Sequence, residues 1–176
     1  MRILSYLPAI LSVILVNILF SFIDSKLDLT EDKKHSISEE TINILNNLDD
    51  QIFIKVYLKG DFPAEFKHLE YEVLNLLRAF RVIAGENLDF EFINPNKTND
   101  NQERLDLFKQ LVKNGLTPTD IEVQSVNLKS NQIIFPGALV YYKEKKRAIN
   151  FLQNSINKDV GNNINNSVEN LEYELI

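Results

Sequence analysis

The residue types that most often carry chemistry are scarce in this chain of 176 residues. There is no cysteine, which excludes thiol catalysis, disulfides and cysteine-ligated zinc. The two histidines, His35 and His68, are too far apart in sequence to form a local metal-binding motif. We expect His35 to face solvent within a charged stretch and His68 to lie on the polar side of a helix. The sequence therefore predicts no catalytic residue, no metal site and no cofactor.

Two carboxylate pairs could in principle provide general acid–base catalysis, for example in a hydrolase. Asp49 and Asp50 stand at the end of an expected helix, while Asp89 and Glu91 alternate with apolar residues of an expected strand. The position of Asp49 and Asp50 is explained by the end of the helix, and Asp89 and Glu91 are expected to point away from the core. Neither pair therefore needs a catalytic role. The sequence also lacks the glycine-rich phosphate loops, the serine-nucleophile motif and the zinc-protease motif.

A long uncharged segment, residues 3–23, follows Arg2 and consists mainly of Leu, Ile and Val. About 20 apolar residues in a helix cross the hydrocarbon core of a bilayer, so this segment predicts a transmembrane anchor in contact with lipid. Asn17 is polar, and we expect it to contact a partner membrane helix. A cleavable signal peptide and a buried core helix are the alternatives, but the segment is long for a signal peptide and ends without a small-x-small cleavage pattern.

The charge distribution limits the location and the partners of the remaining chain. Arg2 and the terminal amine precede the apolar segment, which favours an N-terminus in the cytoplasm and a domain on the extracytoplasmic side. The formal net charge is −6, and Arg2 is the only charged residue before Asp24. An acidic domain without a basic stripe is a poor nucleic-acid binder, so no nucleic-acid partner is predicted.

Hydrophobic periodicity predicts an alternation of helices and strands after a charged stalk. Ser38 is expected to cap a helix with Glu39 and Glu40 in its first turn. The pattern then predicts the order α-β-α-β-α-β-β-β. The strands are expected over residues 51–59, 88–92, 120–126, 132–142 and 146–152, with helical faces over residues 66–84 and 105–112.

Strand–helix–strand units imply parallel pairing, and the last strands are expected to form a hairpin. This combination predicts a thioredoxin-like α/β domain with a mixed sheet but without redox cysteines; a plain open α/β sandwich is the alternative. Pro136 and Gly137 interrupt the strand over residues 132–142, so a bulge, a bend or a late strand start is expected there. The thioredoxin analogy further predicts a cis Phe135–Pro136 bond.

In a thioredoxin-like arrangement, the loop after the first strand lies near the turn before the first hairpin strand. These two segments are the candidate recognition edge, although Gly and Pro in the loop are also explained by the turn itself. The edge consists of Gly60, Asp61, Phe62, Pro63, Pro136 and Gly137.

Four parts are expected along the chain. Residues 1–23 form the anchor, 24–37 a juxtamembrane stalk and 38–153 the α/β domain. Residues 154–176 are expected to be an Asn-rich linker and, from Ser167, the start of a helix that leads to a missing C-terminal region.

Six segments, in register over almost the whole chain, resemble the GldG family of gliding-motility ABC-transporter accessory proteins of the Bacteroidetes. They are residues 27–33 (LDLTEDK), 37–41 (ISEET), 54–63 (IKVYLKGDFP), 90–95 (FEFINP), 134–138 (IFPGA) and 165–175 (NNSVENLEYEL).

The resemblance implies an inner-membrane protein whose domain lies in the periplasm and which works beside an ATPase and a membrane permease. Family members are longer, so the chain resembles only their N-terminal part, and the family provides no catalytic residues to carry over. We therefore expect a non-enzymatic accessory or binding subunit of an ABC-type transport system associated with gliding motility. The alternative is a structural scaffold of an envelope or motility complex without a transport role.

Overall fold

The computed structural model describes residues 37–125, 128–152 and 160–176. The predicted anchor, the predicted stalk up to residue 36, Asn17 and His35 lie outside these ranges. In chain order the elements are α2 (Glu39–Asn46), β1 (Ile52–Val56), α3 (Ala64–Ala84), β2 (Leu88–Phe92), α4 (Asn101–Lys113), β3 (Thr119–Ser125), β4 (Leu128–Ile134), β5 (Gly137–Tyr142), β6 (Lys145–Asn150) and α5 (Val160–Leu175). A short 3-10 turn, Gly85–Asn87, joins α3 to β2.

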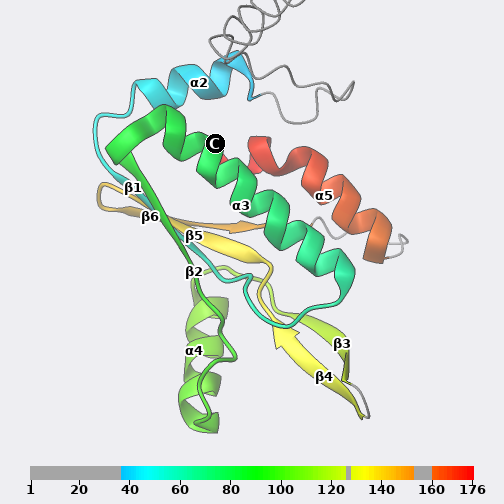
Figure 1. Ribbon diagram of the computed structural model, residues 1–176. Helices are drawn as coiled ribbons and strands as arrows, with labels where there is room; N and C mark the ends of the chain where they lie inside the picture. The colour runs from blue at the N-terminus through cyan, green and yellow to red at the C-terminus, as the bar shows by residue number, and fades with distance from the viewer. Residues whose placement is uncertain (1–36, 126–127, 153–159) are drawn as a thin grey trace, which may run out of the picture. The chain divides into compact units, whose positions relative to one another are not determined.

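The central sheet has the strand order β2-β1-β5-β6 (Figure 1). β1 pairs in parallel with β2 and antiparallel with β5, and β5 forms an antiparallel hairpin with β6. α3 is the crossover that connects the two parallel strands. The predicted mixed sheet, parallel in its first part and antiparallel at its end, is confirmed.

One face of the sheet forms the main core beneath α3 and α5 (Figure 1). The register places Ile54 of β1 between Phe90 of β2 and Val140 of β5, so their side chains share this face. α3 covers it because its apolar residues recur every three or four positions. Its buried residues are Phe66, Leu69, Val73, Leu77 and Phe80.

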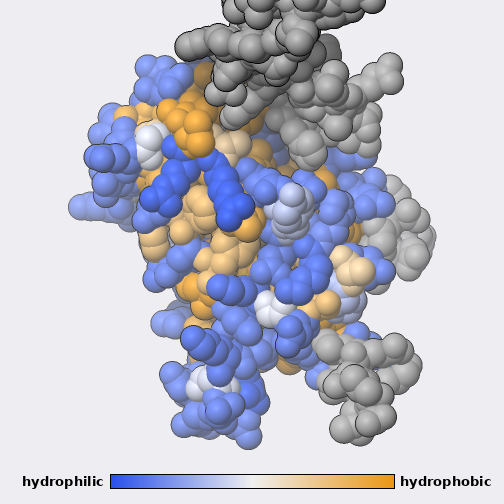
Figure 2. Space-filling model, viewed as in Figure 1, coloured by the Kyte–Doolittle hydropathy of each residue, from blue (hydrophilic) through white to orange (hydrophobic). Residues whose placement is uncertain are grey.

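The opposite face of the sheet carries a second, smaller apolar cluster against which α4 packs. Tyr57 and Leu139 belong to this cluster, together with Leu111 of α4. Phe108 of α4 contacts Phe135, with ring centroids 5.1 Å apart. Leu111 is the only buried residue of α4, and the side of this helix seen in Figure 2 is almost wholly hydrophilic.

The chain departs from the predicted strands between residues 132 and 142. β4 ends at Ile134 and pairs with β3 in a separate two-stranded sheet, whereas β5 starts at Gly137 in the central sheet. The expected late strand start at Gly137 is confirmed, but one predicted strand is two strands in different sheets. A tight turn separates them, in which the N–H of Gly137 donates to the carbonyl of Phe135 at 2.8 Å.

The predicted cis Phe135–Pro136 bond is wrong, because the described residues contain no cis peptide bond. The trans geometry fits the local hydrogen bonds. The carbonyl of Pro136 accepts from the N–H of Phe151 at 2.8 Å, and the carbonyl of Gly137 accepts from the N–H of Tyr57 at 2.9 Å. The turn therefore enters the central sheet with both carbonyls paired.

The predicted linker over residues 154–166 is partly wrong, because α5 begins at Val160 rather than at Ser167. Residues 153–159 lie outside the described ranges. Ile164, Ser167 and Leu171 are buried, and the two apolar residues join the main core. The helix is thus part of the domain.

No helix among the described residues is long and apolar enough to cross a membrane. The surface does carry some exposed apolar side chains near the contact of α2 with α3. Ile44 of α2 is 47% exposed, and Val82 of α3 is 82% exposed. Figure 2 shows hydrophobic surface where these two helices meet.

Candidate functional site

The carboxyl ends of β1 and β2 lie at the same end of the sheet because the two strands are parallel. The loop after β1 leads to α3 on one face, and the loop after β2 leads to α4, which packs on the other face (Figure 1). Open α/β sheets usually bind their ligands in the crevice outside strand ends that diverge in this way. The candidate site is therefore built from these two loops and α4.

The first loop, residues 59–63, contains four of the residues predicted as a recognition edge. A Cβ at Gly60 would lie 3.0 Å from Cε1 of Phe62, so the turn brings the backbone close to this ring. Phe62 is half-buried against the main core, and the Lys67 ammonium lies 5.4 Å from its ring centre. Asp61 is exposed, and Pro63 precedes α3 without a side-chain cap.

Pro136 and Gly137 lie at this same end of the sheet, as the hydrogen bond from Tyr57 to Gly137 shows. Both residues are buried. A Cβ at Gly137 would lie 2.5 Å from the carbonyl oxygen of Ile149, so the close approach of β6 requires glycine here. These two residues shape the end of the sheet, while the exposed part of the predicted edge is the loop after β1.

The second loop, residues 93–100, is held by its own polar side chains. Asp100 caps α4, and its carboxylate accepts from the N–H groups of Gln102 and Glu103 at 2.8 and 3.3 Å. The Thr98 hydroxyl donates to the Glu103 carboxylate at 2.7 Å. The Asn96 amide donates to the carbonyl of Ile133 at 2.9 Å, which ties this loop to the end of β4.

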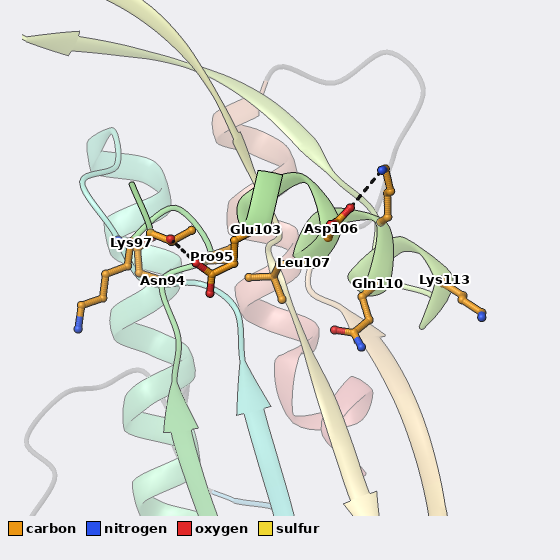
Figure 3. Close-up of a pocket in the computed structure, with 10 residues that line it drawn as sticks. Asn94, Pro95, Lys97, Glu103, Asp106, Leu107, Gln110 and Lys113 are labelled. Atoms are coloured by element: carbon orange, nitrogen blue, oxygen red, sulfur yellow. Dashed lines mark hydrogen bonds and ion pairs between the residues drawn. The ribbon is translucent and has the colours of Figure 1, made fainter. Parts of the chain in front are cut away.

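An open depression of about 810 Å³ lies between this loop and α4 (Figure 3). Glu103, Leu107 and Gln110 project into it from one side of α4, at the spacing of a helical face. Lys97 and Lys113 lie at its two ends in Figure 3. The complete lining is Asn94, Pro95, Lys97, Thr98, Glu103, Asp106, Leu107, Lys109, Gln110 and Lys113.

The charges around the depression are mixed and only partly paired. Asp106 accepts hydrogen bonds from Gln102 and Lys109, and these lower the pKa of its carboxyl group. Lys97 and Lys113 form no ion pair with any residue that the structure describes. The depression is open, and eight of its ten lining residues are polar or charged. Such a lining suits a charged or hydrogen-bonding surface of a partner better than an enclosed small molecule.

The other candidate residues have structural partners. Asp89 pairs with Arg81 at 3.2 Å, and Glu91 pairs with Lys55 at 3.3 Å. Asp49 pairs with Lys143 at 2.7 Å and accepts a hydrogen bond from Tyr142; these contacts lower the pKa of Asp49, with Lys143 as the larger cause. No group of three or more metal-binding side chains occurs in the described part of the chain.

Sequence reasoning identified the loop after β1 but not the depression beside it. Asn94, Lys97 and the lining residues of α4 are ordinary loop and helix residues in sequence. Asn94 lies close to Gly60 because β1 and β2 are parallel: a Cβ at Gly60 would lie 3.6 Å from Nδ2 of Asn94. The depression could have been anticipated from one general rule: the loops that follow adjacent parallel strands lie at the same end of the sheet.

A family model described as "Domain of unknown function (DUF7088)" matches residues 31–141, which is more than half of the chain. Comparison with curated proteins and with solved structures gives no match.

Proposed function

The chain belongs to the DUF7088 domain family, and from this premise we propose that it is a non-enzymatic binding subunit of an ABC-type transport system associated with gliding motility. Residues 3–23 would anchor it in the cytoplasmic membrane, with the α/β domain outside. ATP hydrolysis would take place in a separate ATPase subunit, and a permease would contact the anchor near Asn17. The resemblance to the GldG family supports this assignment.

The proposed fold family is thioredoxin-like. Three features support it: the order β2-β1-β5-β6, the parallel β1–β2 pair and the antiparallel β5–β6 hairpin. The placement of α3 and α5 on one face of the sheet and α4 on the other also supports it. The trans Phe135–Pro136 bond limits the likeness to the arrangement of elements. The chain has no cysteine, so a thioredoxin-type redox reaction is excluded.

One observation carries the binding role: Lys97 and Lys113 stand at the two ends of an open depression, lined mainly by polar and charged residues, whose framework is already hydrogen-bonded. Because Thr98, Asp100 and Glu103 hold the loop, the surface is already formed before a partner binds. Little conformational entropy of the loop would then be lost on binding. The two ammonium groups would pair with carboxylates of that partner. The loop with Gly60 and Asp61 would border the contact.

The test is affinity purification of the tagged full chain from gently solubilised native membranes, followed by mass spectrometry. We expect an ABC ATPase and a multi-span permease in fixed proportion. The double variant Lys97→Glu/Lys113→Glu should recover clearly less of them, since only the contact through the anchor would remain. The control Arg78→Glu changes an exposed residue of α3, away from the depression, and should retain them.

Recovery of envelope or motility components without an ATPase would replace the transporter assignment with the scaffold alternative. Recovery of the transporter by the double variant at the wild-type level would place the contact elsewhere on the chain.

A further inference from the structure

The outer edge of β6 has no strand partner among the residues that the structure describes. β6 is the last strand in the order β2-β1-β5-β6 and pairs with β5. No strand within residues 37–125, 128–152 and 160–176 pairs with its other side. An exposed strand edge is a template on which another extended segment can form a ladder of hydrogen bonds.

The direction of each backbone group in β6 follows from one hydrogen bond. The N–H of Phe151 donates to the carbonyl of Pro136, so Phe151 bonds inward to the β5 side. Inward and outward residues alternate along an antiparallel edge strand. The N–H and C=O groups of Lys146, Ala148 and Asn150 therefore point outward.

The charge of this edge is basic. Lys145, Lys146 and Arg147 are consecutive and exposed. The Lys146 ammonium donates to Oδ1 of Asn114 at 2.6 Å, whereas Lys145 and Arg147 form no ion pair with any described residue. Their side chains lie on the same face of the strand, two positions apart.

The opposite edge of the sheet, formed by β2, has charged side chains that are paired within the chain. Asp89 and Glu91 of β2 are both paired within the chain, with Arg81 and Lys55. The sheet thus neutralises the charges on one edge and leaves basic charge on the other. Lysines on an edge hinder pairing with neutral or basic strands, but they favour a strand with carboxylates at matching positions.

We propose that the outer edge of β6 binds an extended acidic segment of a partner protein, which joins the sheet as an additional strand. Its backbone would bond to Lys146, Ala148 and Asn150. Acidic side chains two residues apart would lie opposite Lys145 and Arg147. This strand addition is independent of the depression beside α4 and of the transporter assignment.

The probe is a terminally blocked peptide of alternating glutamate and valine, added to the full chain, with a lysine–valine peptide of the same length as the control. Residue-resolved amide hydrogen exchange is the measurement. We expect the glutamate peptide to slow exchange at Lys146 and Ala148 by about tenfold or more, since their outward N–H groups become bonded. The inward N–H groups of Arg147 and Ile149 should change much less.

Two sets of variants separate the backbone contribution from the charge contribution. Lys146→Pro removes one outward N–H while leaving the inward ladder to β5, and it should abolish the protection; Lys146→Ala keeps the N–H and should retain most of it. The double variant Lys145→Glu/Arg147→Glu keeps every N–H and should also abolish the protection, while Arg78→Glu, a single charge reversal away from this edge, should retain it.

Equal protection by the lysine peptide, or none by either peptide, would overturn the proposal. Protection of Ala148 without peptide that disappears on dilution would also overturn it, because the edge would then bind a second copy of this chain.

Discussion

The Thr41 hydroxyl donates a hydrogen bond of 2.5 Å to Oε1 of Glu172, which joins the first turn of α2 to the last turn of α5. The same oxygen accepts from the N–H of Ser38 at 2.8 Å, so Glu172 acts as a second cap at the start of α2. Thr41 is fully buried. The two ends of the described domain are thereby held together by one carboxylate.

Replacing Thr41 with valine should lower the free energy of unfolding. Valine has nearly the same shape but no hydroxyl, so Glu172 loses one charge-assisted hydrogen bond at a partly buried position, at a cost of about 2 kcal/mol. Urea unfolding of the full chain would measure the loss. Thr117→Val is the control, since Thr117 is exposed and its described hydrogen bond uses only its backbone N–H. Equal stability of the Thr41→Val and Thr117→Val variants would mean that the Glu172 contact contributes nothing.

The same carboxylate makes stability depend on pH. Burial raises the pKa of Glu172, but the hydrogen bonds from Thr41 and Ser38 outweigh it and set the pKa below the ordinary value of 4.5. The unfolded chain therefore takes up the proton first. The contribution of Glu172 is fully present above pH 4.5 and is lost as the pH falls through the lower folded value. Unfolding measured over a series of acidic pH values should show this loss, and the Glu172→Gln variant should show a smaller one.

Periodicity in the sequence predicted the central sheet well, because β1 and α3 have strong and different patterns. Ile54 and Val56 alternate with less buried residues, while the buried residues of α3 recur every three or four positions. Both patterns report directly which face is buried. The mixed sheet and the helix that covers its main core, α3, could therefore be predicted from the sequence.

The hairpin β3–β4 and the start of α5 were less predictable for physical reasons. The residues on both sides of Pro136, such as Ile134, Phe135 and Leu139, are apolar. Nothing in that pattern indicates that the segment before the turn joins one sheet and the segment after it joins another. In α5, asparagines surround Ile164, and asparagine is a weak helix former. Tertiary contact with the main core outweighs that weak propensity.

The candidate site was only half visible in the sequence for a related reason. Gly60 and Pro63 mark a turn wherever they occur, so that loop could be identified. Lys97 and Lys113 come to line one depression only when α4 folds back beside the loop after β2. A depression made by tertiary packing has no local sequence pattern.

Tyr57 should ionise later than an ordinary tyrosine. Its pKa is raised to about 12, mainly by burial and to a smaller extent by Tyr141 and Glu91. Because the folded pKa exceeds the unfolded value of 10.0, Tyr57 stabilises the fold below pH 10.0, and this contribution is lost as the pH rises toward 12. Tyrosinate absorbance during an alkaline titration would show a late component. Tyr57→Phe should reduce it but not abolish it, because the hydrogen bond to Asp49 also raises the pKa of Tyr142. A wild-type titration with all tyrosines ionising together near the ordinary value would contradict the burial of this hydroxyl.

Gly137→Ala should destabilise the domain more than Gly85→Ala, for different reasons. The new methyl group at position 137 would lie 2.5 Å from the backbone oxygen of Ile149 and 2.9 Å from Cδ2 of Leu116. The backbone of β6 cannot move aside without breaking its pairing with β5, so we expect a loss of about 3 kcal/mol. At Gly85, where φ is +62°, a Cβ meets nothing within 4 Å. Alanine there meets no atom, but φ +62° with ψ −129° is a backbone conformation that glycine adopts far more readily than alanine, so we expect a loss of about 2 kcal/mol from the backbone alone.

Urea unfolding of the two glycine variants would measure this difference, and a further variant identifies its source. Adding Leu116→Ala to Gly137→Ala removes the side-chain clash but keeps the contact with the oxygen of Ile149. We therefore expect the double variant to stay at least as unstable as Gly137→Ala. Recovery of wild-type stability would instead show that Leu116, and not the backbone of β6, excludes a side chain from position 137.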